Sequence, residues 1–355
     1  MTINHLSLLL VSIASAVFYS NFSWAAEKPL FESATPIQAV LTAPITQTYR
    51  QRKQDVRLYF DGHFSYKNDQ TSHKLPVKIR TRGNFRRLNC DHPPLHLNFV
   101  RKGNDNTLFE KQNKLKLVGV CNNSRSHRQL VALEYLAYKI WEEISNHHFR
   151  TRLINLSYVD TDQKKKPWTS TTFVIEDIND VAERLNKKVF GVERVSRRQM
   201  DMPQTALLEL FQLLIGNGDY STLTTQPGNS CCHNTRLLVD KGAHDGVIPI
   251  PYDFDVSGLV NASYAKPPDQ YPIRSVRQRY FTGWCKEDRH FLSAIQHINT
   301  RRSKIYDRVQ NLQILDDATR NKTVRYLDSF FKMINDEKRV KREIIGRCRG
   351  NLIQG

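Results

Sequence analysis

The sequence predicts an α+β protein of two lobes, a sheet-rich N-lobe followed by a helix-rich C-lobe. Segments that alternate apolar and polar residues, the pattern of half-buried strands, are concentrated before about residue 177. Segments with apolar residues at helical spacing dominate after that point. The expected organisation is a signal peptide over residues 1–25, a sheet-rich lobe over 26–176 and a helical lobe over 177–355.

Residues 1–25 have the pattern of a secretory signal. The run LSLLLVSIASAVF is apolar but too short to span a bilayer, and Ser23-Trp24-Ala25 offers small residues at a cleavage position. The charged part before the run is weak, since only the α-amino group and His5 are available. A buried N-terminal helix or a membrane anchor is the alternative. We expect a periplasmic or secreted protein with no transmembrane segment in the mature chain.

The chain is strongly basic, with 53 Lys and Arg against 35 Asp and Glu and a net charge of +18. This charge favours anionic partners such as phosphate ligands, nucleic acid or anionic polymers of the cell surface. A solvated basic surface without a partner is an equally simple explanation. We expect a nucleotide and a protein or cell-surface polyanion as partners, and we do not expect nucleic acid.

Six cysteines in an exported chain favour disulfide bonds over free thiols. Cys90 follows the first predicted hairpin and Cys121 ends the segment KLKLVGV. A bridge between them would hold two neighbouring strands together. A zinc site is the disfavoured alternative, because the chain has no CxxC pair.

The other four cysteines leave the connectivity open. Cys231 and Cys232 are adjacent, and a bridge between adjacent cysteines strains the peptide that joins them. Cys285 and Cys348 are therefore their expected partners.

The first half predicts a hairpin and several further strands. Residues 57–66 and 75–81 alternate apolar and polar side chains, and Asp61-Gly62 is the expected turn. Residues 27–55 contain an amphipathic stretch to which the sequence assigns no element. The remaining expected strands of this half are residues 93–99, 114–118, 153–160 and 171–176.

Two long helices are expected. Residues 126–146 place apolar side chains on one face at helical spacing. Residues 203–215 are apolar on nearly every side, which predicts a buried central helix that ends at Gly216. Further expected elements are a short helix over 180–186, strands over 235–239 and 246–250, and helices in the C-terminal tail.

Four oxygen-bearing side chains follow the buried helix: Asp219, Asn234, Asp253 and Asp255. Asp253 and Asp255 stand two residues apart in the extended run PYDFD, so their carboxylates are expected to lean to one side. Two carboxylates and an amide oxygen suit Mg²⁺ or Mn²⁺, especially an ion that also binds phosphate oxygens. An upstream Asp can accept a proton from an attacking hydroxyl. This division of roles is typical of kinase-type phosphoryl transfer.

Basic residues of the first half are candidates for phosphate binding. Arg82 and Gly83 lie within RTRGNFRR, and Lys114 and Lys116 share one face of an expected strand. Glu134 lies beside the apolar stripe of the long helix, where it can reach a lysine of those strands. Each residue also has a plain interpretation as a solvated hairpin arginine, a surface lysine or an exposed helix glutamate.

The order of these motifs resembles the CotH-type (spore coat protein H-like) atypical kinases, within a broader group of secreted bacterial proteins of unassigned activity. The resemblance implies a two-lobed atypical protein-kinase-like fold, with ATP as co-substrate and Mg²⁺ or Mn²⁺ as the metal. The motifs, within residues 75–260, are RTRGNFRR, KLKLV, HRQLVALEYLAYKI, FVIED, GNGDY, HNTRLL and PYDFD.

The resemblance also assigns roles to residues. Asp219 is implied to be the catalytic residue, and Asn234 and Asp253 are implied metal ligands supported by Asp255. Asn234 stands fifteen residues after Asp219, where kinase loops have about five, so LTTQPGNSCC is interpreted as an insertion. The implied nucleotide-binding residues are Arg82, Gly83, Lys114, Lys116, Glu134 and, beside the adenine, Glu176.

The sequence therefore predicts an exported metal-dependent phosphotransferase that moves a nucleotide phosphoryl group to a protein or cell-surface hydroxyl. The main alternative is a kinase-like scaffold without catalytic activity that binds a polyanion or a protein partner. A metal-dependent nuclease or phosphodiesterase is a third interpretation, with His233 as its candidate histidine. Serine hydrolysis is not supported, because the chain has no G-x-S-x-G motif.

Overall fold

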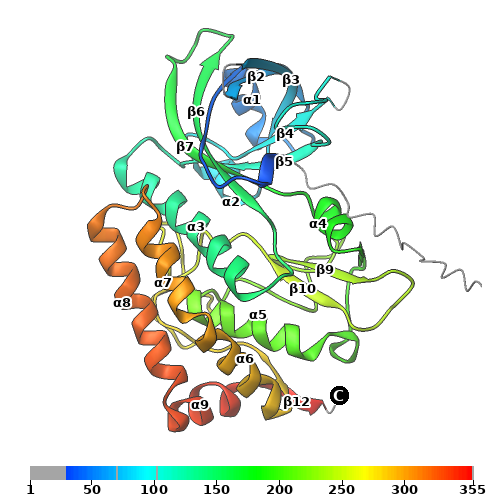
Figure 1. Cartoon of the computed structure of the whole chain (residues 1–355), viewed down its shortest axis with the longest axis vertical. Helices are drawn as coiled ribbons and strands as arrows, with labels where there is room; N and C mark the ends of the chain where they lie inside the picture. Colours follow the sequence, from blue (N-terminus) through cyan, green and yellow to red (C-terminus); the bar gives the residue numbers. More distant parts are fainter. Residues whose placement is uncertain (1–28, 69–70, 101–102, 354–355) are drawn as a thin grey trace, which may run out of the picture.

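The computed structural model describes residues 29–68, 71–100 and 103–353. The predicted signal peptide lies outside the described residues. Figure 1 shows a β-barrel at one end of the molecule and a group of helices at the other, with α3 (Arg125–Ile144) running beneath the barrel. Among the described helices, none is long and apolar enough to cross a lipid bilayer.

Seven strands close into the barrel in the order β1-β2-β3-β4-β5-β7-β6. The closing strand is β1, which pairs antiparallel with β2 and parallel with β6. All other neighbours in the barrel pair antiparallel. The strands are β1 (Ile37–Ala43), β2 (Phe60–Asn68), β3 (Thr71–Thr81), β4 (Leu95–Phe99), β5 (Lys114–Val118), β6 (Thr151–Asp160) and β7 (Trp168–Ile175).

The interior of the barrel is a packed apolar core. Along β3, every second side chain from Leu75 onward is buried and the alternate ones face outward, as the period of a strand requires. Phe64, Phe99 and Phe109 meet inside, with ring centroids 4.5 to 5.7 Å apart. Side chains therefore fill the barrel, and Lys74, Lys78 and Arg80 of β3 point to the outside.

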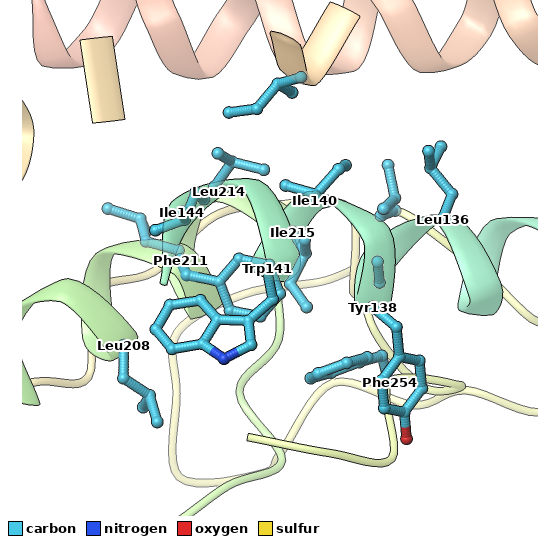
Figure 2. Packing of buried hydrophobic residues seen from close by; sticks show 14 of the residues in the cluster. Leu136, Tyr138, Ile140, Trp141, Ile144, Leu208, Phe211, Leu214, Ile215 and Phe254 are labelled. Atoms are coloured by element: carbon cyan, nitrogen blue, oxygen red, sulfur yellow. The ribbon is translucent and has the colours of Figure 1, made fainter. Parts of the chain in front are cut away.

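Most of the helices lie outside the barrel and pack together with α3. A second apolar core joins α3 to the helices of the C-terminal half, and Figure 2 shows Trp141 and Ile144 of α3 against Phe211 and Leu214 of α5. The helices besides α3 are α1 (Ile45–Arg50), α2 (Phe85–Asn89), α4 (Ile178–Arg184), α5 (Met202–Ile215), α6 (Asp288–Thr300), α7 (Arg302–Asn311), α8 (Asp317–Ile334) and α9 (Glu337–Glu343).

Two small sheets lie among these helices. The first has the order β10-β9-β8 and the second pairs β11 with β12 in parallel. Their strands are β8 (Lys187–Val189), β9 (Thr235–Asp240), β10 (Ile248–Pro251), β11 (Trp284–Lys286) and β12 (Arg349–Ile353).

The expected two-lobed, kinase-like fold is wrong. The N-terminal sheet closes on itself, because residues 37–43, to which the sequence assigned no element, form the strand that joins β2 to β6. The helix α3, expected within a sheet-rich lobe, instead shares one core with α5, α6, α7 and α8. That core also includes Phe173 and Ile175 on the outer side of the barrel. A closed barrel fused to helices through a common core replaces the two lobes.

Most of the individual strands and helices expected from periodicity are confirmed to within a few residues. The turn expected at Asp61-Gly62 is wrong, because both residues lie inside β2. A Cβ atom on Gly62 would lie 2.7 Å from the Cβ atom of Ala43 in β1. The glycine therefore allows two strands to approach closely and does not mark a turn.

Three cysteine pairs lie at disulfide distance: Cys90–Cys121, Cys231–Cys232 and Cys285–Cys348. The first pair confirms the expected bridge. The expected pairing of Cys231 and Cys232 with Cys285 and Cys348 is wrong. Parallel pairing of β11 with β12, in which Trp284 stands opposite Arg349, brings Cys285 close to Cys348, with Cα atoms 4.8 Å apart. The adjacent cysteines bridge to each other within a small apolar cluster that includes Leu237.

Candidate functional site

The position of Asp219 is set by the end of α5. This helix stops at Gly216, whose φ of 65° is in the left-handed region that favours glycine. In the turn that follows, the Asp219 N–H donates to Asn217 Oδ1 at 3.0 Å, and Asn217 Nδ2 donates to Gln212 Oε1 of the helix at 3.0 Å. The backbone of Asp219 is thus fixed to a buried helix, while 44% of its side chain remains exposed.

Both oxygens of the Asp219 carboxylate have partners. Asn234 Nδ2 donates to Oδ2 at 2.9 Å and to the backbone oxygen of Asp219 at 2.7 Å. His233 Nε2 lies 2.8 Å from Oδ1. Hydrogen bonding to Asp219 raises the pKa of His233, although burial opposes the shift. Asp219 and Asn234 therefore converge, as the sequence predicted, and His233 joins them.

The insertion between Asp219 and Asn234 does not keep them apart, because the loop folds back on itself. The Ser221 N–H donates to the oxygen of His233 at 2.9 Å, and the His233 N–H donates to the oxygen of Thr224 at 3.1 Å. These two bonds return the chain to its starting point before β9 begins.

Asp253 is held beside Asn234 by its backbone. The neighbouring Tyr252 N–H donates to the oxygen of Asn234 at 3.1 Å, and the Asp253 N–H donates to the hydroxyl of Tyr138 in α3 at 3.0 Å. Asp253 has a φ of 64°, a left-handed conformation that is unfavourable for most non-glycine residues. Since β10 ends at Pro251, Asp253 lies in a loop and not in the extended run expected for it.

Asp255 follows Asp253 by two residues in the same loop. The hydroxyl of Tyr264 donates to its Oδ2 at 3.0 Å. Burial and the charge of Asp253 raise the pKa of Asp255 to about 6, and the opposing charge of Arg86 limits the rise. The two carboxylates thus repel each other, and an additional cation would stabilise both.

Arg86 and Glu134 form a buried ion pair next to these carboxylates. Arg86 Nη1 lies 3.1 Å from Glu134 Oε2, and Arg86 Nη2 also donates to the oxygen of Gly119. Burial raises the pKa of Glu134 and the charge of Arg86 opposes the rise, while the charges of Asp255 and Asp253 add to it. The partner of Glu134 is therefore an arginine of α2, and not a lysine of the strands.

Lys116 comes from the barrel side of the site. Its Nζ atom lies 4.3 Å from the centroid of the Tyr252 ring, and the guanidinium carbon of Arg236 lies 5.0 Å from the same centroid. Burial and the charges of Arg82 and Arg236 lower the pKa of Lys116 to about 7, while the charge of Asp253 opposes them. Cations of the barrel strands and of β9 thus adjoin the acidic loop.

Comparison with family models, with curated proteins and with solved structures found no match. Any functional assignment therefore depends on the site geometry.

Three of the expected nucleotide-binding residues, Lys114, Gly83 and Glu176, have different surroundings. Lys114 is exposed on β5, and Gly83 has open space where a Cβ atom would stand. The carboxylate of Glu176 is fully engaged, because it accepts hydrogen bonds from Arg184 at 2.9 and 3.1 Å and from the Arg150 N–H at 3.0 Å. Glu176 therefore holds α4 against the barrel and presents no free oxygen toward the acidic loop.

The sequence interpretation did not select two residues that the geometry brings to the site, Arg86 and Tyr138, and it considered His233 only for the nuclease alternative. Arg86 was visible within RTRGNFRR, but nothing in the motif distinguishes it from its neighbours. Tyr138 follows Glu134 by four residues on the same helix, so both necessarily lie on one face of α3. That spacing was a usable signal.

The donor set fits a hard divalent cation. Within residues 29–68, 71–100 and 103–353, no group of three or more His, Cys, Asp or Glu side chains is arranged to hold a metal. A cation at Asp253 would thus also need the amide oxygen of Asn234 and oxygen atoms of a ligand, which is the mode preferred by Mg²⁺. The raised pKa of Asp255 is the observation that favours an additional cation.

A small cavity of about 20 Å³ adjoins Asp219 on its other side. Its walls include Gly218, Pro268 and Tyr271, and the Tyr271 ring stacks on Tyr280 with centroids 5.3 Å apart. A larger cavity of about 540 Å³ lies between α3 and α7 and includes none of the acidic site residues. The acidic site and the 540 Å³ cavity are therefore in different places, and we assign function from the side chains of the acidic site.

Proposed function

We propose that the protein is an exported metal-dependent phosphotransferase, which transfers the terminal phosphoryl group of a nucleotide to a hydroxyl group of a protein or cell-surface acceptor. The observation that supports this most directly is the convergence of Asp219, Asn234 and Asp253. Asn234 bonds to the Asp219 side chain at 2.9 Å, and its backbone oxygen bonds to the residue before Asp253. The resemblance to CotH-type kinases stays a prediction.

Asp219 is the proposed proton acceptor. As the acceptor oxygen bonds to the terminal phosphorus, its O–H bond breaks and the proton passes to Asp219. The anhydride P–O bond breaks at the same centre, and the nucleoside diphosphate leaves. His233 and Asn234 orient the carboxylate through bonds of 2.8 and 2.9 Å.

Asn234, Asp253 and Asp255 would hold the metal. A bound Mg²⁺ or Mn²⁺ ion supplies neutralisation of the phosphate charge. Lys116 and Arg82 are the proposed phosphate-binding cations. The charges of Arg82 and Asp253 both influence the pKa of Lys116, so the two cations lie near each other and near Asp253. Arg86 positions Glu134 and does not contact the reacting groups in this proposal.

The test is metal-dependent phosphate release or transfer from ATP, measured for the wild type, Asp219→Asn and Asp253→Asn. Each substitution keeps the side-chain shape, so we expect unchanged circular dichroism and a loss of turnover on the order of 10²-fold or more. Lys322→Gln, on the exposed side of α8, is the control and should retain full activity. Equal turnover in the wild type and in Asp253→Asn would refute the assignment.

A scaffold without catalytic activity is the second candidate. The observation that favours it is that both Asp219 oxygens are already hydrogen-bonded, to His233 and Asn234. Thermal unfolding with ATP and Mn²⁺ separates the two candidates, because a ligand that binds the native state raises the midpoint temperature. No rise at millimolar nucleotide favours the scaffold, and a rise that Asp253→Asn abolishes favours the enzyme.

A further inference from the structure

Three neighbouring barrel strands align basic side chains on their outer face. The register places Arg80 of β3 opposite His96 of β4, and His96 opposite Lys116 of β5. One step along the strands, Lys78 stands opposite Asn98, and Asn98 opposite Lys114. Because the residues between these positions are buried in the barrel, all of the aligned side chains lie on the outside.

We call six residues of this surface the basic face: Lys74, Lys78, Arg80, Arg82, Lys114 and Lys116. Among the outward positions of the described β3, β4 and β5 strands, none is acidic. Lys78 has a carboxylate partner in Asp61 of β2, at 3.3 Å. With 47% and 85% of the two side chains exposed, this pair contributes little and leaves the lysine available.

The basic face is long. Residues 74–82 cover roughly 27 Å at the rise of an extended strand. Its end at Arg82 and Lys116 adjoins the acidic loop, and its other end at Lys74 is remote from it. A run of this length offers several anion positions in line, which suits a polymer with repeated charges better than a single nucleotide.

The pKa of His96, which lies in the middle of the basic face, reflects the density of positive charge there. Burial, together with the charges of Arg82 and Lys116, lowers the pKa of His96 to about 3. The charges of Arg82, Lys116, Arg80 and Lys114 all act in this direction, so several cations lie around the neutral histidine. An anionic ligand would relieve this repulsion.

Two aromatic rings near the face, those of Tyr59 and Tyr252, are covered by cationic side chains. The guanidinium of Arg80 lies 4.6 Å from the ring centroid of Tyr59, and Lys116 and Arg236 cover Tyr252. Single-stranded nucleic acids bind by stacking bases on open aromatic rings, and these two rings are already occupied. The surface therefore favours a polyanion without bases.

We propose that the basic face binds a linear phosphate-bearing polymer without nucleobases, such as a chain of phosphodiester-linked polyols or sugars. Repeated phosphates of the polymer pair with the arginine and lysine side chains along β3. Binding requires neither a nucleotide nor phosphoryl transfer, so this proposal stands apart from the proposed function.

The test is the affinity for a fluorescently labelled poly(glycerol phosphate) chain, measured by anisotropy over a range of salt concentrations without nucleotide. The variant Lys74→Gln/Lys78→Gln/Arg80→Gln removes three cations of the basic face to which the proposed function assigns no role. We expect at least a tenfold weaker affinity, and a slope of log affinity against log salt that is smaller by about 2, since each single-strand phosphate contact contributes about 0.7.

The matched control is Lys322→Gln/Lys332→Gln/Lys338→Gln, which removes the same charge from exposed positions of α8 and α9. It should bind within about twofold of the wild type. Equal weakening in both triple variants would show an effect of net charge and overturn the proposal, as would no binding by the wild type. Lys74→Glu alone, at an exposed site, gives the same direction of effect if the triple variant does not fold.

A single-stranded oligonucleotide with a matched number of phosphates tests the choice of partner. Weaker binding of the oligonucleotide than of the polymer supports a ligand without bases. Tighter binding of the oligonucleotide would overturn that part of the proposal in favour of nucleic acid.

Discussion

Asn234 Nδ2 lies 2.9 Å from Oδ2 of Asp219, although fifteen residues of chain separate the two side chains. The loop between them is closed by two backbone hydrogen bonds at His233. Asp219 and Asn234 therefore lie in one compact acidic site, even though their separation in the sequence is longer than in kinase loops.

Replacing Asn234 by alanine tests the metal side of that site. The variant removes the amide oxygen available to a cation and the bond that orients Asp219, so we expect at least tenfold weaker Mn²⁺ binding and lower turnover. Isothermal titration with Mn²⁺ in the presence of nucleotide measures the first effect. Asn261→Ala, which also replaces an exposed asparagine of positive φ, is the control for the backbone change. Unchanged Mn²⁺ affinity in Asn234→Ala would exclude this residue as a ligand.

The Arg86–Glu134 pair is expected to be important for stability. Glu134→Ala leaves a buried guanidinium without its carboxylate, which costs about 3–5 kcal/mol of unfolding free energy. Glu337→Ala is the comparison, because its bridge to Lys341 is exposed and should contribute less than about 1 kcal/mol. Urea unfolding measures both. A loss for Glu134→Ala no larger than that for Glu337→Ala would contradict the buried pairing.

His96 gives a pH dependence of stability with a defined sign. Its folded-state pKa is lowered to about 3 from the ordinary value of 6.5, so the folded state binds fewer protons than the unfolded state between these values. Its contribution to stability is complete above about pH 6.5 and is lost as the pH falls toward 3. The difference in midpoint temperature between wild type and His96→Gln should therefore shift against the wild type on acidification. A difference that does not vary between pH 7 and pH 4 would rule out this titration.

Gly62 tests the closure of the barrel. Gly62→Ala places a Cβ atom 2.7 Å from that of Ala43, so strands β1 and β2 must separate. We expect a loss of about 1–3 kcal/mol from overpacking, measured by urea unfolding. Gly191→Ala is the control, because a Cβ atom there meets nothing within 4 Å. Equal stability of the two variants would argue against tight packing at this position.

Local elements of the fold follow from the sequence, because hydrophobic period depends only on neighbouring residues. The long helix α3 and the buried helix α5 were both predictable in this way. Barrel closure was not, since β1 pairs with β6 more than a hundred residues later. The turn predicted at Gly62 was wrong for a related reason. A glycine is needed there because Ala43 of another strand packs closely against it, and not because the chain turns.

The candidate site also has features that the local sequence predicts and features that depend on tertiary packing. The position of Asp219 just after a buried helix and that of Asp253 just after a proline-bounded strand were predictable, whereas their roles stay predictions. The partner of Glu134 was not predictable, because the arginine-rich motif offers several equivalent cations and only packing selects Arg86. The pairing of Cys285 with Cys348 likewise depends on the parallel pairing of β11 with β12.

The helix α3 contacts the two halves of the site one turn apart. Glu134 bonds to Arg86 next to the barrel, and Tyr138 accepts a bond from the backbone of Asp253. Four residues of a helix advance about 6 Å along its axis. The rigid turn between Glu134 and Tyr138 therefore sets the distance between α2, which carries Arg86, and the acidic loop. A substitution that displaced α3 along its axis would alter this distance without replacing any charged group. The affinity for a ligand of the site would then change with the position of α3.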